Sequence, residues 1–464
     1  MAGTEAAADI ENVKNTDVIE VEALLSCMSR RLDALPETDP LTIFRVPAYI
    51  RERNKRLYEP MWTAIGPHHH GKEHLQAMEK RKWWYLRDLL SRSTTTSNAN
   101  LGGLLGKMKT MEEEARRCYG ENITLGSDEF VEMMVLDACL IIELFLRCHN
   151  RDGRLYRAGW GMKFLQMDLL LLENQIPFFV IEGLFELVVG GAESREMPSL
   201  IQLLYTYLMS RTAEEESEPH PPTPPQIHHI LHLYYLWSLF PMDPGMHMPE
   251  NHPALLERLI SLLFSCFPSE KSERSRQVTY VIPCATELRK AGARFRVKRS
   301  PRHMLDVTFR NGVMEIPLVL ITDLNEATFT NLVAFEQSIR EDWWYVTSFF
   351  LLMNSLINSE KDVAILRQCG VMDNFLGSEE EVALFFNQLG DYATFYPEEH
   401  FFSDLFREVN RYRDSRWHRY RTTLARDYFG NPWAILSLVA ALILLAFTFL
   451  QTFFTIYAYF PPRK

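Results

Sequence analysis

The stretch from Trp433 to Phe454 constrains this chain more than any other, because its 22 residues include no charged side chain. A helix of that length spans a hydrocarbon core of about 30 Å. Trp433 begins the stretch, and Tyr457 and Tyr459 follow it, where aromatic rings would lie at the two membrane interfaces. The sequence therefore predicts a transmembrane helix at 433–454, with a buried helix of a soluble core as the alternative.

Charges on either side of this stretch indicate its orientation. Seven arginines lie within 407–426, whereas only Arg463 and Lys464 follow it. Because positive charge favours the cytosolic side, we expect a single-pass, tail-anchored protein with a cytosolic bulk domain and a luminal or extracellular tail at 455–464. Membrane lipid is then an expected partner through 433–454. The first twenty residues carry five acids and no apolar secretory signal, which agrees with this topology.

The composition is that of a folded chain with an acidic surplus. The 464 residues are 47% hydrophobic and 23% charged, as in average globular proteins. The formal net charge of −11 opposes capture of phosphate backbones, so nucleic acid is not an expected partner. Seven cysteines without a CxxC pair favour a reducing compartment.

Changes in composition predict how the chain is organised. The sequence EEESEPHPPTPP, which begins at Glu214, combines acids with five prolines and is typical of an exposed linker. The predicted order is a disordered start with a short amphipathic helix at 1–40, a proximal helical half at 41–212, the acidic Pro-rich linker at 213–226 and a distal helical half at 227–427.

Hydrophobic periodicity predicts helices through most of both halves. In the proximal half, helices are expected at 73–90, 107–119 and 128–148. The stretch from Ser91 to Gly106 is interpreted as a flexible loop, because threonines and glycines gather there. The helix at 128–148 is apolar nearly all round and should therefore be central.

One region departs from the helical pattern. Short β-type runs occur within 295–321, and the pair Asn311-Gly312 separates two of them. Such a pair is a strong hairpin signal, because both residues tolerate the positive φ of a tight turn. The predicted fold class is mainly α: a multi-helix globular domain with one small antiparallel β-hairpin element and a C-terminal transmembrane helix.

Several polar residues stand inside apolar stretches, where they must be hydrogen-bonded or paired. They are Asp137, Glu143, Asp168, Glu173, Asn174 and Gln175. Spacings of six and five residues keep the two acid pairs off a common helical face, which disfavours a catalytic acid and base. We expect buried networks that fix helix packing instead. For the polar run before Pro177, we predict hydrogen bonds to the helix ends that this proline leaves free.

Adjacent histidines form a second polar cluster, in the phrase IGPHHHG that contains His69 and His70. Three imidazoles could bind zinc, but adjacent residues seldom converge on one ion and no HExxH pair is present. The favoured interpretation is that the turns around them expose these rings, which cap the following helix or hydrogen-bond to neighbouring loops. His228 and His232 share a helical face without a carboxylate or cysteine nearby in sequence. No metal and no cofactor is predicted.

The sequence contains none of the GxGxxG, GxxxxGK[ST] or GxSxG patterns of known enzymes. Two classes of function remain open. The favoured one is a membrane-anchored, non-enzymatic interaction or recognition protein whose partner is an unknown protein or small peptide. The other is an enzyme whose site follows no known motif. The sequence is compatible with a homo-oligomer or a hetero-oligomer.

Characteristic phrases along 41–460 resemble those of a plant-specific family, the domain of unknown function 247. They include IFRVP at 43–47, IGPHHHG at 65–71, MEKRKWWYL at 78–86, LLLLENQIPFFV at 169–180, FRNGVMEIP at 309–317 and YFGNPWA at 428–434, which contains Asn431, Pro432 and Trp433. The resemblance implies a C-terminal apolar span and no established catalytic residues. For certain grass members it implies a pollen-side role in self-incompatibility, so signalling or self-incompatibility is one expected form of the recognition function.

Overall fold

The computed structural model describes most of the chain, with gaps. The described residues are 21, 24–30, 32, 41–92, 100–150, 160–189, 198–208, 226–239, 281–339, 344–392, 400–414 and 432–459. Of the predicted linker at 213–226, only Gln226 is among them, and Asn431 and the last residues of the predicted tail also lie outside them. The boundaries of the two halves therefore stay a prediction.

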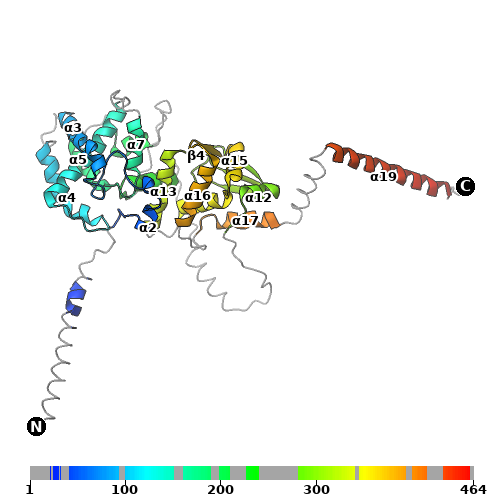
Figure 1. The fold of residues 1–464 in the computed structure, drawn as a ribbon, viewed down its shortest axis with the longest axis horizontal. Coiled ribbons are helices and arrows are strands. Elements are labelled where there is room, and N and C mark those ends of the chain that lie inside the picture. The colour runs from blue at the N-terminus through cyan, green and yellow to red at the C-terminus, as the bar shows by residue number, and fades with distance from the viewer. Residues whose placement is uncertain are drawn as a thin grey trace, which may run out of the picture.

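The helix α5 (Ser127–His149) lies at the centre of the N-terminal half, as its all-round apolar sequence predicts. Its residues from Phe130 to Leu146 are buried with the single exception of Glu132. Figure 1 shows it surrounded by other helices. Those that contact it are α3 (Gln76–Arg92), α4 (Leu101–Arg117), α8 (Phe178–Val189) and α9 (Leu200–Leu208).

A segment with little regular structure, 41–75, lies against this helical body. It contains α2 (Ala48–Arg51) and the 3₁₀ turns η1 (Lys55–Leu57) and η2 (Glu73–Leu75). Its start is held at the end of α4, where the backbone N–H of Ile43 donates to the carbonyl of Cys118 at 2.9 Å. The half is completed by α7 (Trp160–Leu169) and by α10 (Ile230–Leu239). Although α10 lies in the predicted distal half by sequence, the N–H of its Leu231 donates to the Gln175 side chain at 3.2 Å.

The C-terminal half combines helices with short strands. Its helices are α12 (Ala285–Lys290), α13 (Asp323–Ser338), α14 (Tyr345–Leu356), α15 (Glu360–Gln368), α16 (Glu379–Tyr392) and α17 (Ser403–Asp414). Its strands are β1 (Arg294–Val297), β2 (Thr308–Arg310), β3 (Val313–Ile316), β4 (Val319–Ile321) and β5 (Met372–Asn374). The described chain is thus mainly helical, as its periodicity predicts.

The hairpin lies where the sequence predicts it, but the β structure is larger than one hairpin. Strands β2 and β3 pair antiparallel, with Asn311 at φ 52° and Gly312 at φ 76° in the turn. A Cβ on Gly312 would lie 2.5 Å from the Tyr412 hydroxyl, so both backbone and space require glycine. Strand β1 adds parallel to β3, and β4 pairs with β5 in a separate parallel sheet.

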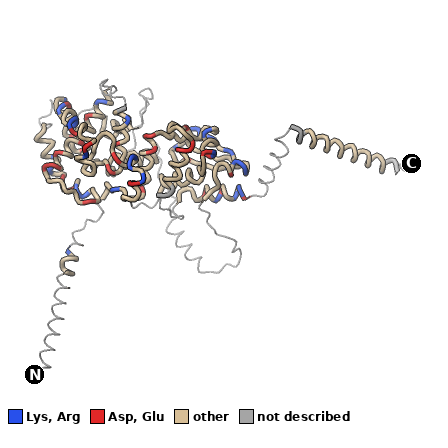
Figure 2. Tube along the Cα trace, in the orientation of Figure 1, with Lys and Arg blue, Asp and Glu red and all other residues tan. Residues whose placement is uncertain are grey.

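The helix α13 joins the two halves (Figure 1). Asn331 donates to the carbonyl of Leu57 at 2.7 Å and accepts from the backbone N–H of Leu172 at 2.9 Å. Arg56 forms an ion pair with Glu326 at 2.7 Å. The buried apolar side chains of both halves accordingly form one hydrophobic cluster. Figure 2 shows acidic and basic residues interspersed over both halves.

The predicted transmembrane helix at 433–454 requires correction. The structure has a helix there, α19 (Pro432–Tyr459), and Pro432 and Trp433 begin it. No helix in the described part of the chain is long and apolar enough to cross a membrane.

Candidate interaction site

Two of the predicted polar residues hold the segment 61–65 against the end of α7. The carboxylate of Asp168 accepts from the backbone N–H groups of Met61, Trp62 and Thr63 at 2.7 to 2.8 Å. Burial raises the pKa of Asp168 to about 7, although these three donors lower it. Asn174 accepts from Ile65 at 2.8 Å and donates to the carbonyls of Thr63 and Asp168 at 3.1 and 2.9 Å.

The neighbours of Asn174 bond in other directions. Glu173 accepts from the backbone N–H of Val46 at 2.9 Å and forms an ion pair with Arg51 at 3.3 Å. Burial raises the pKa of Glu173, against the pull of Arg51. The amide of Gln175 donates to the carbonyls of Leu169 and Leu171 at 2.7 and 2.8 Å. These bonds satisfy carbonyl groups at the end of α7. The prediction that Pro177 itself leaves helix ends free is wrong, because Pro177 directly precedes α8.

The histidine turn is not exposed as predicted, because His69 is buried beside Glu173. Among the described residues, neither ring nitrogen of His69 has a hydrogen-bond partner, and one nitrogen of His70 lacks one too. Burial lowers the pKa of His69 to about 3, so this imidazole is neutral. No group of His, Cys, Asp and Glu side chains within the described ranges is placed to hold a metal ion.

A buried ion cluster lies under the same turn. Lys82 is fully buried, and its ammonium lies 2.5 Å from Asp137 and 2.5 Å from Glu79. The other oxygen of Asp137 accepts from the backbone N–H of Gly66 at 2.7 Å. A Cβ on Gly66 would lie 2.4 Å from the carbonyl oxygen of Gln175, so only glycine fits at this position.

Glu143 forms a second ion cluster, at the far end of α5. Its carboxylate is fully buried and bonds Arg92 at 3.0 Å and Arg147 at 2.7 Å. Arg147 also reaches Asp88 at 2.6 Å. The cluster therefore ties α3 to α5. Each of the predicted acids is thus bonded to backbone N–H groups or to cations: Asp137, Asp168 and Glu173 bond the segment 41–75, and Glu143 bonds two arginines of α3 and α5.

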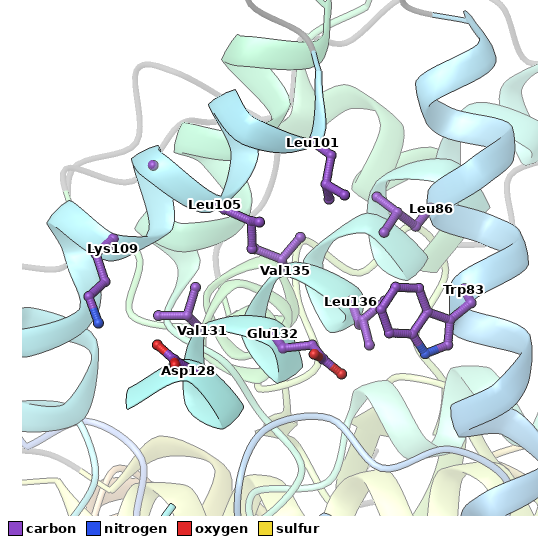
Figure 3. A pocket seen from close by; sticks show the side chains of 11 residues that line it. Trp83, Leu86, Leu101, Leu105, Lys109, Asp128, Val131, Glu132, Val135 and Leu136 are labelled. Atoms are coloured by element: carbon purple, nitrogen blue, oxygen red, sulfur yellow. The ribbon is translucent and has the colours of Figure 1, made fainter. Parts of the chain in front are cut away.

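A surface groove between α3, α4 and α5 is the candidate functional site (Figure 3). Its volume is about 560 Å³. None of the polar residues singled out in the sequence lies in it. Its lining residues are Trp83, Leu86, Leu101, Leu105, Gly106, Lys109, Asp128, Val131, Glu132, Val135 and Leu136.

The groove has a buried apolar floor and a half-exposed apolar rim. The floor side chains of α3 and α5, such as Leu86 and Val135, are 4% and 2% exposed. Above them, Trp83 is 48% exposed, and Leu101 and Leu105 are 44% and 36% exposed. Apolar side chains left open to water beside a concave surface are typical of a protein interaction site.

Charges at one end of the groove are unevenly compensated. The ammonium of Lys109 forms an ion pair with Glu112 at 3.0 Å and also contacts the Ser127 hydroxyl. Partial burial raises the pKa of Glu112, but hydrogen bonds to Ser127, Lys109 and Arg116 outweigh this effect and bring the pKa down to about 2. Glu112 is therefore ionised and neutralises Lys109. The exposed carboxylates of Asp128 and Glu132 then give this end a net negative character.

The groove is not evident from the sequence, because the threonines and glycines up to Gly106 indicate a loop. In the structure α4 begins at Leu101, and the Asn100 side chain caps it by accepting from the N–H of Gly103 at 2.8 Å. The signal was available: an Asn cap followed by apolar residues at 101, 104, 105 and 108 is a helix start. The glycines at 102 and 103 concealed it, because glycine lowers helix propensity.

Comparison of this sequence with known proteins shows the family of the chain. A family model described as plant protein of unknown function, the domain of unknown function 247, matches residues 43–447. The Arabidopsis thaliana UPF0481 protein At3g47200 is 27% identical over 91% of this chain and 87% of its own, and the putative UPF0481 protein At3g02645 of the same plant is 25% identical over 90% and 91%. No solved structure matches. The chain therefore belongs to the plant family named domain of unknown function 247.

Proposed function

We propose that this protein is a non-enzymatic interaction protein that binds an apolar segment of a partner protein in the groove between α3, α4 and α5. The half-exposed Trp83, facing Leu101 and Leu105 over a buried floor, carries the proposal. Tryptophan beside a concave apolar surface supplies much of the binding energy at protein interfaces. Asp128 and Glu132 favour a partner with positive charge beside its apolar residues.

The shape of the groove favours a helical partner. The groove follows α4 from Leu101 to Lys109, a rise of about 12 Å at 1.5 Å per residue, or about two helical turns. A partner helix would place apolar side chains at i, i+3, i+4 and i+7 in such a groove. A role in signalling or self-incompatibility is the finer form of this proposal, and it rests on the family resemblance alone.

The contacts of the acidic residues support a non-enzymatic function over the enzyme alternative. Asp168 accepts three backbone N–H groups, and Glu143 is paired with two arginines. These acids hold the fold together away from the groove. Within the groove, the ammonium of Lys109 is already paired with Glu112.

Gly106 allows the groove to be filled without disturbing the fold. A Cβ at this position would meet no atom within 4 Å. Gly106→Ala is therefore expected to raise the free energy of unfolding by about 0.5–1 kcal/mol, because alanine has the higher helix propensity. Gly106→Trp should keep the fold and occupy the groove. Denaturation curves of both variants check the first expectation.

Binding is tested with a displayed library of 16-residue peptides selected on the wild-type protein. We expect enriched peptides with apolar residues at helical spacing next to lysine or arginine. These peptides should bind Gly106→Ala like the wild type and bind Gly106→Trp at least about tenfold more weakly, a loss of about 1.4 kcal/mol. Equal binding to the two variants, or no enrichment, would refute the proposed function. Proximity labelling in the native tissue with the Gly106→Ala and Gly106→Trp variants then identifies the partner.

We also propose that the folded body lies in a reducing, non-luminal compartment. Cys118 and Cys139 are buried and not disulfide-bonded, and burial raises the pKa of Cys139 to about 12. Asn122-Ile123-Thr124 is an N-glycosylation sequon, and its Asn122 is exposed, so it would accept a glycan in the secretory lumen. A glycosidase treatment of the native protein is expected to leave its mobility unchanged. A shift that disappears in Asn122→Gln would place the body in the lumen.

A further inference from the structure

A second apolar surface of this chain remains open, near its N-terminus. The described residues between Val21 and Leu32 are helical (Figure 1). Five apolar side chains on one helical face are 54% to 64% exposed: Val21, Leu24, Leu25, Met28 and Leu32. Their spacing of three, four and seven residues is that of a helix which buries one face against a groove. We call residues 21–32 the N-terminal segment.

The point of attachment brings this segment within reach of the groove. Thr42 and Ile43 are bonded to the carbonyl of Cys118 at 3.1 and 2.9 Å, directly after α4 ends. From there, the groove end at Lys109 lies about 14 Å along α4, at 1.5 Å per residue. The residues 33–40 that connect the segment to this point span up to about 28 Å when extended. The connection is therefore long enough.

Length and charge agree with one orientation in the groove. A continuous helix from residue 21 to residue 32 would be about 18 Å long, and the groove extends about 12 Å along α4. Because the connection leaves the segment after Leu32, that end would lie near Lys109, Asp128 and Glu132. In the sequence the two residues before Leu32 are arginines, which suits the two carboxylates.

We propose that the N-terminal segment occupies the α3–α4–α5 groove of its own chain when no partner is bound. This inference rests on the proposed function and adds its regulation: a partner must displace the segment to bind. A tethered segment competes at an effective concentration in the millimolar range, which lowers the apparent affinity of any partner for the groove. The groove and the segment's apolar face would cover each other.

The test uses the full chain and a fluorescent peptide of residues 18–32, with anisotropy as the readout. Met28→Glu places a charge on the apolar face of the segment, and Ser26→Glu places one on the opposite face. The peptide is expected to bind the Met28→Glu chain at least about tenfold more tightly than the wild type, because the competing segment is released. The Ser26→Glu chain should behave like the wild type. Adding Gly106→Trp to Met28→Glu should abolish binding.

The possible outcomes separate this inference from the proposed function. Equal peptide binding to the wild-type and Met28→Glu chains would show that the segment does not occupy its own groove, and would overturn the inference. The absence of peptide binding to the Met28→Glu chain would overturn it as well. In both cases the library peptides still decide whether the groove binds a partner. Binding that survives Gly106→Trp would place the segment elsewhere and also refute the inference.

Discussion

Asn174→Leu is expected to lower the free energy of unfolding by about 3 kcal/mol or more. Leucine matches asparagine approximately in size but offers no polar group, so three partners lose their hydrogen bonds: the N–H of Ile65 and the carbonyls of Thr63 and Asp168. All three lie in the buried interior, where an unsatisfied group costs about 1–3 kcal/mol. Urea denaturation of the variant and the wild type measures the difference.

Gln166→Leu is the matched control for this variant. Gln166 lies on the adjacent helix α7, is half-buried, and makes one hydrogen bond of 3.3 Å to the carbonyl of Leu208. Its replacement should cost less than about 1 kcal/mol. If Asn174→Leu unfolds at the same urea concentration as the wild type but loses a function of the protein, the structural role of Asn174 is wrong and the enzyme alternative gains support.

Acidification below pH 6.5 is expected to destabilise this protein steeply. Four of the histidines that the structure describes lie in the interior: His69, His229, His232 and His400. Burial lowers the pKa of His69 and His232 to about 3 and that of His400 to about 4, and holds the pKa of His229 well below its usual value. Below pH 6.5 the unfolded chain therefore binds protons on these histidines that the folded chain does not bind. The resulting loss is about 1.4 kcal/mol per pH unit for each histidine between about 6.5 and the folded value.

Buried acids act in the opposite direction and offset part of this loss. Burial raises the pKa of Asp168 to about 7 and also raises those of Glu173 and Glu336. Such acids destabilise the fold as the pH rises through their window, so they contribute stability as the pH falls. These acids offset part of the histidine contribution, so the net loss on acidification is smaller than the four histidines alone would give.

A single substitution tests the contribution of one histidine. His69→Leu removes a ring whose nitrogens have no hydrogen-bond partner among the described residues, so stability at neutral pH should be kept. The dependence of stability on pH below 6.5 should become shallower by about 1.4 kcal/mol per pH unit. Gly106→Ala removes no titratable group and should leave the slope unchanged. An identical slope for His69→Leu and the wild type would contradict the assignment.

Local patterns in the sequence predict the features that depend on neighbouring residues. The central position of α5 follows from its apolar residues on every face, and the β2–β3 turn follows from Asn311-Gly312. The same patterns do not identify long-range partners. Asp168 bonds Met61, more than a hundred residues earlier, and only the folded chain brings the two together.

Short strands and the groove depend on contacts that no local signal encodes. Strands β4 and β5 are three residues each and pair in parallel across about fifty residues of chain, so their pairing comes from tertiary packing. The groove needs three helices at once, and the start of α4 at Leu101 was concealed by its glycines. The burial and bonding of Asp137, Glu143 and Asp168 could be predicted, whereas their partners, the burial of His69 and the groove could not.

The position of α13 also bears on how such a chain can evolve. This helix is encoded after the predicted linker, yet its Asn331 completes hydrogen bonds of Leu57 and Leu172, which are encoded before it. Exchange of either half with that of a distant relative would leave these backbone groups unpaired unless Asn331 and its partners were inherited together. The two halves are thus expected to diverge as a unit, by substitution within one chain and not by domain shuffling.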